Sequence, residues 1–292
     1  MKRWQRDYGL STRMFLTMFM LFVVYIAFIG VLSYLGLPLI TILLVAGVML
    51  FVQYYFSDKM VLYSTGARVV TESEEPGLHE IVSRLCIEAD LPKPRIAVVD
   101  SSIPNAFATG RSPKKALVAV TTGLTQRLDR NEVAAVLAHE LTHVKNRDVM
   151  VLTIASFFST IAFFLVRYLI FFGGGNRREG GQIMIAWLAS IAVWIVSYLL
   201  IRALSRYREF AADRGAAIIT GHPSHLVSAL MKISGSMDRV PTDDLRKAEG
   251  MNAFYIIPAI SKSSIMALFS THPPLKKRVA ALEKISREME LA

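Results

Sequence analysis

The chain alternates long apolar stretches with blocks that carry most of its charge. No charged residue occurs between Arg13 and Asp58, and Gly36-Leu37-Pro38, a turn signature, divides this stretch into the segments 14–35 and 39–56. As helices, the two segments would be about 33 Å and about 27 Å long, which matches the hydrocarbon core of a bilayer. The pattern predicts a transmembrane hairpin at 14–57. The alternative is a cleaved signal peptide, which would have a shorter apolar region and a small-residue cleavage site.

A second apolar pair, 149–172 and 183–201, flanks a glycine-rich turn. The segment 183–201 has no charge and carries two tryptophans, which are typical of membrane interfaces. The segment 149–172 contains Arg167, which in lipid would have to snorkel to the interface, pair with an acid or face protein. We therefore expect a second hairpin at 149–201 and four spans in all. Arg167 leaves open a hairpin that enters the bilayer only partly.

Basic residues are distributed asymmetrically around the predicted spans. Several precede the first span, the turn at 36–38 has none, and others follow the last span (Lys2, Arg3, Arg6, Arg13; Arg202, Arg206, Arg208). The positive-inside rule then predicts that residues 1–13 and the blocks 58–148 and 202–292 are cytoplasmic. Composition agrees, since 53% of residues are hydrophobic and 19% are charged. The net charge of +10 fits loops that face anionic lipid better than it fits a nucleic-acid-binding protein.

Helical and strand patterns both occur in the cytoplasmic blocks. Apolar residues at helical spacing predict helices, and short valine-rich runs bounded by Gly and Pro predict strands. The predicted elements are helices at 68–90, from Asn131 and at 274–290, strands at 95–99 and 116–120, and a loop at 235–250. No Pro or Gly occurs between Asn131 and Phe172, so the helix from Asn131 is predicted to continue into the third span. The whole chain is thus predicted to be a mainly α membrane protein with a small sheet.

The predicted helix from Asn131 contains His139-Glu140-Leu141-Thr142-His143. Residues four apart lie on one helical face, so His139 and His143 can present two imidazole nitrogens to a single zinc ion. Zinc lowers the pKa of a water ligand to about 7, and a neighbouring carboxylate can take the proton as the water attacks a carbonyl. The motif indicates a zinc hydrolase with Glu140 as the general base.

A catalytic zinc needs a third protein ligand. Glu209 and Asp213 are four residues apart and follow the fourth span directly. If the third and fourth spans pack antiparallel, these two acids return beside His139 and His143. One acid can then bind zinc while the other accepts the free ring N–H of a ligating histidine.

Two other patterns could supply the third ligand. A metzincin would have Gly at 146 and His at 149, where this chain has Asn146 and Val149. His222 and His225 are the rival ligands, but their sequence context predicts a surface turn between helices.

Together these motifs resemble those of the HtpX-type membrane metalloproteases, relatives of the CAAX prenyl endoproteases and, more distantly, of the thermolysin-like gluzincins. The resemblance covers nearly the whole chain and includes both hairpins, the two motifs just described, and the segments Ser102–Gly110 and Ser270–Leu275. It implies a cytoplasmic gluzincin-like α+β protease domain beside the four transmembrane helices. It also implies a set of roles: zinc ligands His139, His143 and Glu209, general base Glu140, and Asp213 orienting His139.

The resemblance implies two further roles. Asn105, Ala106 and Phe107 look like the gluzincin edge strand, which pairs with an extended peptide substrate. His272, just before Pro273, stands in a setting in which a histidine of the relatives stabilises the developing oxyanion.

The implied function is that of a multi-pass zinc endopeptidase of the inner (plasma) membrane, with its active site facing the cytoplasm and one zinc ion per chain. Its substrates would be the cytoplasmic regions of misfolded or damaged membrane proteins, or other unfolded polypeptides, in quality control and stress response. One alternative is a CAAX-type prenyl protein endopeptidase, which is built with more than four spans. A site-two-type intramembrane protease would place the zinc helix in lipid, where the charges of Lys145 and Arg147 do not fit. A non-catalytic zinc-binding scaffold would have no need of Glu140.

Overall fold

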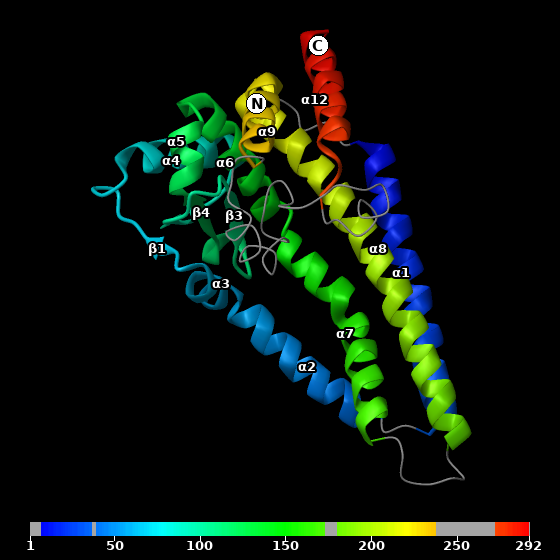
Figure 1. Cartoon of the computed structure of the whole chain (residues 1–292). Coiled ribbons are helices and arrows are strands. Elements are labelled where there is room, and N and C mark those ends of the chain that lie inside the picture. The colour runs from blue at the N-terminus through cyan, green and yellow to red at the C-terminus, as the bar shows by residue number, and fades with distance from the viewer. Residues whose placement is uncertain (1–6, 37–38, 173–179, 238–271, 292) are drawn as a thin grey trace. The chain divides into compact units, whose positions relative to one another are not determined.

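The computed structural model describes residues 7–36, 39–172, 180–237 and 272–291 (Figure 1). The predicted loop at 235–250 lies largely outside the described residues. The chain forms two compact units. We call Asp7–Tyr55 with Met150–Ser205 the helical unit, and the described parts of Phe56–Val149 and Arg206–Ala292 the mixed unit.

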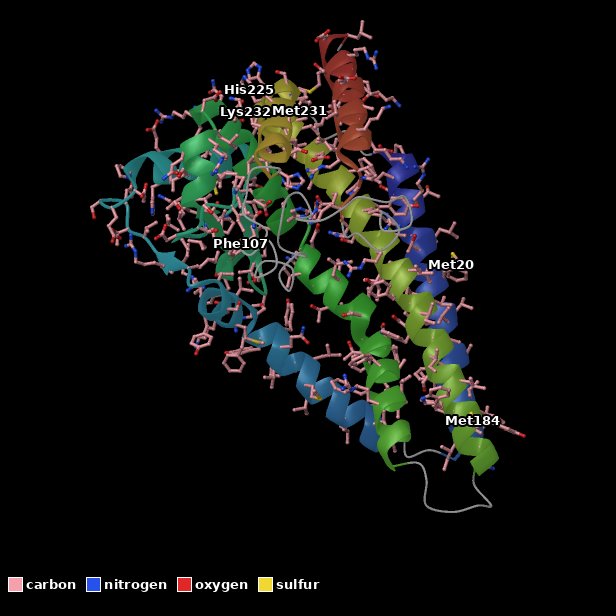
Figure 2. The ribbon with its side chains drawn as sticks, viewed as in Figure 1. Met20, Phe107, Met184, His225, Met231 and Lys232 are labelled. Atoms are coloured by element: carbon pink, nitrogen blue, oxygen red, sulfur yellow. The ribbon has the colours of Figure 1, made fainter. Side chains whose placement is uncertain are left out.

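The helical unit consists of long apolar helices. They are α1 (Tyr8–Tyr34), α2 (Leu39–Tyr55), nearly all of α7 (Asp148–Phe172) and the first part of α8 (Gly180–Thr220). Large apolar side chains such as Met20 and Met184 point outward from this unit (Figure 2), as expected of helices whose solvent is lipid. In the described part of the chain, α1, α7 and α8 are long and apolar enough to cross a membrane, and a fourth span is present if α2 and the following helix α3 (Ser57–Thr65) form one broken span.

The mixed unit contains a four-stranded sheet with the order β1-β2-β4-β3. The strands are β1 (Arg68–Val69), β2 (Arg95–Val99), β3 (Ala106–Thr109) and β4 (Leu117–Thr121). β2 and β4 are parallel, whereas β1 and β3 pair antiparallel with their neighbours. The predicted strands at 95–99 and 116–120 are confirmed, the second with a shift of one residue. β3 lies at one edge of this sheet.

Helices cover the sheet and enclose the main apolar core. They are α4 (Pro76–Ala89), α5 (Thr122–Arg127), α6 (Arg130–Lys145), α9 (Pro223–Met237) and α12 (Leu275–Glu290). α6 packs against α4, α9 and β3, and most of its side chains are buried. The predicted C-terminal helix at 274–290 is confirmed by α12.

Two predicted helices were wrong in extent. The helix predicted at 68–90 is confined to α4, because Arg68 and Val69 pair with β2 as a strand and Pro76 occupies the first turn of the helix. The helix predicted to continue from Asn131 into the third span is interrupted. α6 ends at Lys145, Arg147 adopts a left-handed backbone with φ of 53°, and α7 begins anew at Asp148.

Candidate metal centre

The helix that carries the metal motif begins with a strong N-terminal cap. The Asp129 side chain accepts from the backbone of Asn131 and Glu132, and the Glu132 side chain accepts from the backbone of Asp129, which forms a capping box. Glu132 is buried and also contacts Ser228 and Lys232 of α9, each at 2.6 Å. α6 is therefore held at its start and packed along its length, which fixes the positions of the side chains that follow.

His139, His143 and Glu209 converge on one point. The Nε2 atoms of the two histidines lie 3.2 Å apart, and the Glu209 carboxylate oxygens lie 3.5 Å and 3.4 Å from them. One candidate ligand atom from each of the three residues lies within 4.8 Å of the others. Two imidazole nitrogens and one carboxylate oxygen are a donor set that fits a catalytic divalent metal such as zinc.

A buried carboxylate holds the His139 ring from its other side. Nδ1 of His139 lies 3.0 Å from Asp213, and the Arg278 guanidinium contacts the two Asp213 oxygens at 2.9 Å and 2.6 Å. Arg278 also lies 3.5 Å from Glu209. All of these side chains are buried. Burial alone would lower the pKa of His139, but Asp213 and Glu209 outweigh it and the net pKa is raised.

A second carboxylate holds the His143 ring. Nδ1 of His143 lies 2.7 Å from Asp148, which forms an ion pair with Arg208. Arg208 also donates to the backbone carbonyl of Asn146 at 2.8 Å. The interruption between α6 and α7 is therefore part of the site, because it turns the first residue of α7 back towards the metal motif. An uninterrupted helix would carry Asp148 to another face, since it lies five residues after His143.

Glu140 is buried beside the three candidate ligands. Burial raises the pKa of its carboxyl group, with a smaller contribution from the nearby charge of Glu209, while the histidines act in the opposite direction. A carboxylate whose affinity for a proton is raised in this way is suited to accept one during a reaction.

The structure brings His272 to the same cluster. Its Nδ1 atom lies 2.9 Å from a Glu209 oxygen, and the side chain is buried just before α12. Ala106 and Phe107 begin the edge strand β3, which packs against α6, and Asn105 directly precedes it. The Asn105 backbone N–H donates to Thr121 at 2.8 Å, and its carbonyl accepts from the Thr121 backbone at 2.9 Å. These contacts tie the beginning of β3 to β4.

The rival ligands His222 and His225 lie elsewhere in the mixed unit. His222 lies in the turn between α8 and α9 and His225 in the first turn of α9, with their ring centroids 5.1 Å apart. In the described ranges they do not join the three-residue metal group.

Motif spacing in the sequence does not predict Asp148, Arg208 or Arg278 as parts of this site. The sequence offers only their nearness to the motif residues. Asp148 follows the metal motif by five residues, Arg208 directly precedes Glu209, and Arg278 follows His272 by six residues. Their pairing joins segments about 60 residues apart, which periodicity along one element does not show.

Known proteins are similar to this chain over most of its length. Residues 72–286 match the model of Peptidase family M48. Protease HtpX homolog 2 of Methanosarcina acetivorans is 64% identical over 291 residues, which cover 99% of this chain and 99% of that protein. The Protease HtpX homolog of Moorella thermoacetica is 59% identical over 289 residues, covering 97% of each.

Among solved structures, the crystal structure of S. mikatae Ste24p matches with a TM-score of 0.58 and 18% identity. The match covers 89% of this chain and 62% of that one, and it shows a shared fold. The family match and the two relatives place the chain in peptidase family M48, among the HtpX-type membrane metalloproteases.

Proposed function

We propose that the chain is a zinc-dependent endopeptidase in which His139, His143 and Glu209 hold the metal. The observation that carries this proposal is the convergence of three ligand atoms within 4.8 Å, with the Nδ1 atom of each histidine held by its own carboxylate. Carboxylate partners of this kind fix the ring orientation and raise the basicity of the ligand. Zinc is proposed over other divalent ions because it favours a site of two histidines and one glutamate with an open position.

When bound, the zinc ion would polarise the scissile carbonyl and acidify a water molecule. Glu140 takes the proton of the attacking water, which its raised pKa favours, and then passes that proton to the leaving amine. His272 lies at the same cluster and is proposed to donate to the developing oxyanion. Asp213, held by Arg278, keeps His139 in its ligating orientation.

The edge strand is proposed as the site for the peptide substrate. β3 packs against α6, the helix of the metal motif, and is hydrogen-bonded to β4 along one of its two edges. An extended peptide can add to its outer edge as a further strand, with Asn105, Ala106 and Phe107 as the contact segment.

The substrates are proposed to be cytoplasmic regions of misfolded or damaged membrane proteins, cleaved in quality control and stress response. Support comes from the basic residues that flank the predicted spans and from the short chain distance between the span 183–201 and Glu209 on the same helix. The proposed topology has four spans, with residues 1–13, 58–148 and 202–292 in the cytoplasm and the chain in the plasma membrane.

The alternatives have less support. Relatives about 60% identical to this chain are named HtpX proteases, whereas the likeness to Ste24p extends to the fold alone, so the CAAX prenyl endopeptidase is not favoured. Membership of a peptidase family argues against a non-catalytic scaffold.

Zinc content tests the ligand set. The purified full-length chain is expected to hold one zinc ion per chain, and Glu209→Gln is expected to lose it because only two protein ligands remain. Glu288→Gln, an exposed acid on α12, is the matched control and should keep its zinc. Stoichiometric zinc in Glu209→Gln would place the third ligand elsewhere.

A further inference from the structure

Helix α3 presents an apolar face to the outside of the mixed unit. Phe56, directly before the helix, Met60 and Tyr63 are spaced by four and three residues and therefore lie on one face. Their exposed fractions are 39%, 54% and 92%. Large apolar side chains grouped on an outer face mark a surface that contacts another apolar phase or partner.

The opposite face of α3 is docked on the sheet. Val61 is 7% exposed and shares an apolar cluster with Phe107 of β3, which Figure 2 labels. Asp58 forms an ion pair with Arg95 at the start of β2, at 2.6 Å. Gly66, with φ of 66°, ends the helix and leads the chain directly into β1. These contacts fix the rotation of α3, so the apolar face cannot turn inward.

The charge of Lys59 and the position of α3 directly after α2 indicate that the apolar face of α3 contacts lipid. α3 begins directly after α2, an apolar helix that is one of the predicted spans. Lys59 borders the apolar face, with its ammonium group 5.7 Å from the Phe56 ring centroid. Aromatic side chains beside a lysine are typical of the headgroup layer, where rings are half immersed and the ammonium meets anionic lipid. The nine residues of α3 are only about 13 Å long, which is too short to cross the bilayer. The charges of Asp58 and Lys59 also make it unsuited to the hydrocarbon core.

We propose that α3 is an interfacial helix that lies in the headgroup layer of the membrane, with Phe56, Met60 and Tyr63 immersed and Lys59 at anionic headgroups. Because α3 packs against β3, this contact seats the edge strand at the bilayer surface. This step rests on the proposed role of β3 in binding substrate. It places cleavage close to the lipid surface.

A fluorescent probe on α3 tests the membrane contact without proteolysis. The full-length chain is placed in vesicles of phosphatidylcholine and phosphatidylglycerol, with an environment-sensitive fluorophore on Tyr63→Cys. Ile87→Cys is the matched control, since Ile87 is 80% exposed on α4 of the same unit. The unsubstituted chain is the labelling blank, because burial raises the pKa of the Cys86 thiol to about 11 and leaves little reactive thiolate.

Lipids that carry a quencher near the headgroup are expected to quench the probe at residue 63 and to leave the probe at residue 87 bright. Equal quenching at the two positions would overturn the proposal. A blue-shifted but unquenched probe at residue 63 would also overturn it, because another protein surface, such as a second copy, would then cover this face.

Proteolysis tests the seating of the substrate strand. Tyr63→Glu is expected to lower kcat/KM for a membrane-anchored substrate by a factor of about five, because it places a negative charge against anionic lipid. Cleavage of casein should be unchanged, and Tyr63→Phe and Ile87→Glu should cleave both substrates normally. An equal fall in kcat/KM for both substrates would overturn the inference that α3 holds β3 at the bilayer surface. If the unsubstituted chain cut neither substrate, the proposed function itself would fail, and the quenching result would still decide whether α3 contacts lipid.

Discussion

At the scale of single residues, two chains of polar contacts flank the candidate metal ligands. In each chain a carboxylate holds the outer nitrogen of one histidine and is itself held by an arginine: His139 with Asp213 and Arg278, and His143 with Asp148 and Arg208. The buried carboxylates thus have charged partners, which offsets the cost of removing them from water. We expect these contacts to orient the two imidazoles for a metal.

Removing the partner of His143 is expected to weaken metal binding. Asp148→Ala leaves the imidazole free to rotate and Arg208 without its ion pair, so we expect zinc affinity to fall by a factor of about 10 to 100. Asp148→Asn keeps a hydrogen-bond acceptor and should lose less. Competition with a chelator measures both, and Asp90→Asn, on the exposed end of α4, is the control. Unchanged affinity in Asp148→Ala would show that this contact does not position the ligand.

The role of His272 is separable from metal binding. If it stabilises the oxyanion, His272→Ala is expected to lower turnover by a factor of roughly 100 or more while zinc stays bound. Steady-state kinetics and zinc content of the same preparation measure the two effects. Because Nδ1 of His272 lies 2.9 Å from Glu209, a parallel loss of zinc would assign it instead to holding that ligand in place.

Spacing within one helix was sufficient to nominate His139, Glu140 and His143, since residues four apart on a helix lie on one face. The position of Glu209 and Asp213 directly after a span was sufficient to nominate the second pair. The arginines were not predictable in this way. Arg208 reaches Asp148 only because Arg147 interrupts the helix, and Arg278 reaches Asp213 only through the packing of α12.

At the scale of elements, the edge strand β3 and the helix α6 form the substrate side of the proposed site. Valine-rich runs predicted β2 and β4 correctly because both are buried on the two faces of the sheet. β1 could not be predicted because a strand of two residues is too short to show an alternating pattern, and it forms only by pairing with β2. The order of the strands, which places β3 at the edge, also depends on tertiary contacts.

Blocking the outer edge of β3 is expected to impair substrate binding. The Thr121 backbone N–H donates to the Asn105 carbonyl, and inward and outward backbone groups alternate along antiparallel strands, so the Ala108 N–H is expected to point to the outer edge. Ala108→Pro removes that donor and should raise KM for peptide substrates several-fold, because a strand hydrogen bond is worth about 1 kcal/mol. Ala108→Val keeps the donor and serves as control. Normal kinetics with Ala108→Pro would place the substrate elsewhere.

At the scale of the whole molecule, the chain divides between a helical unit built of apolar helices and a mixed unit that carries the metal cluster. Hydropathy predicted the apolar helices because a span needs about 20 apolar residues in a row, a signal that tertiary packing does not obscure. The interruption between α6 and α7 at Asn146 and Arg147 is not predictable from the sequence, because neither residue is a Gly or a Pro, which are the residues least compatible with a helix.

The proposed topology is tested by reporter fusions. A reporter at the 36–38 turn is expected to read as non-cytoplasmic, and one after Ala292 as cytoplasmic, because this turn has no basic residue whereas several precede the first span and follow the last. A cytoplasmic readout at the 36–38 turn would overturn the four-span topology and with it the cytoplasmic placement of the mixed unit.

The most direct test of the central claim compares the purified full-length chain with Glu140→Gln, measuring casein cleavage and zinc content after zinc is added. Both are expected to hold one zinc ion per chain, and only the chain with Glu140 is expected to cleave casein, because the variant has ligands but no general base. Cleavage by Glu140→Gln at the rate of the unsubstituted chain would contradict the account, since the reaction would then not depend on this site.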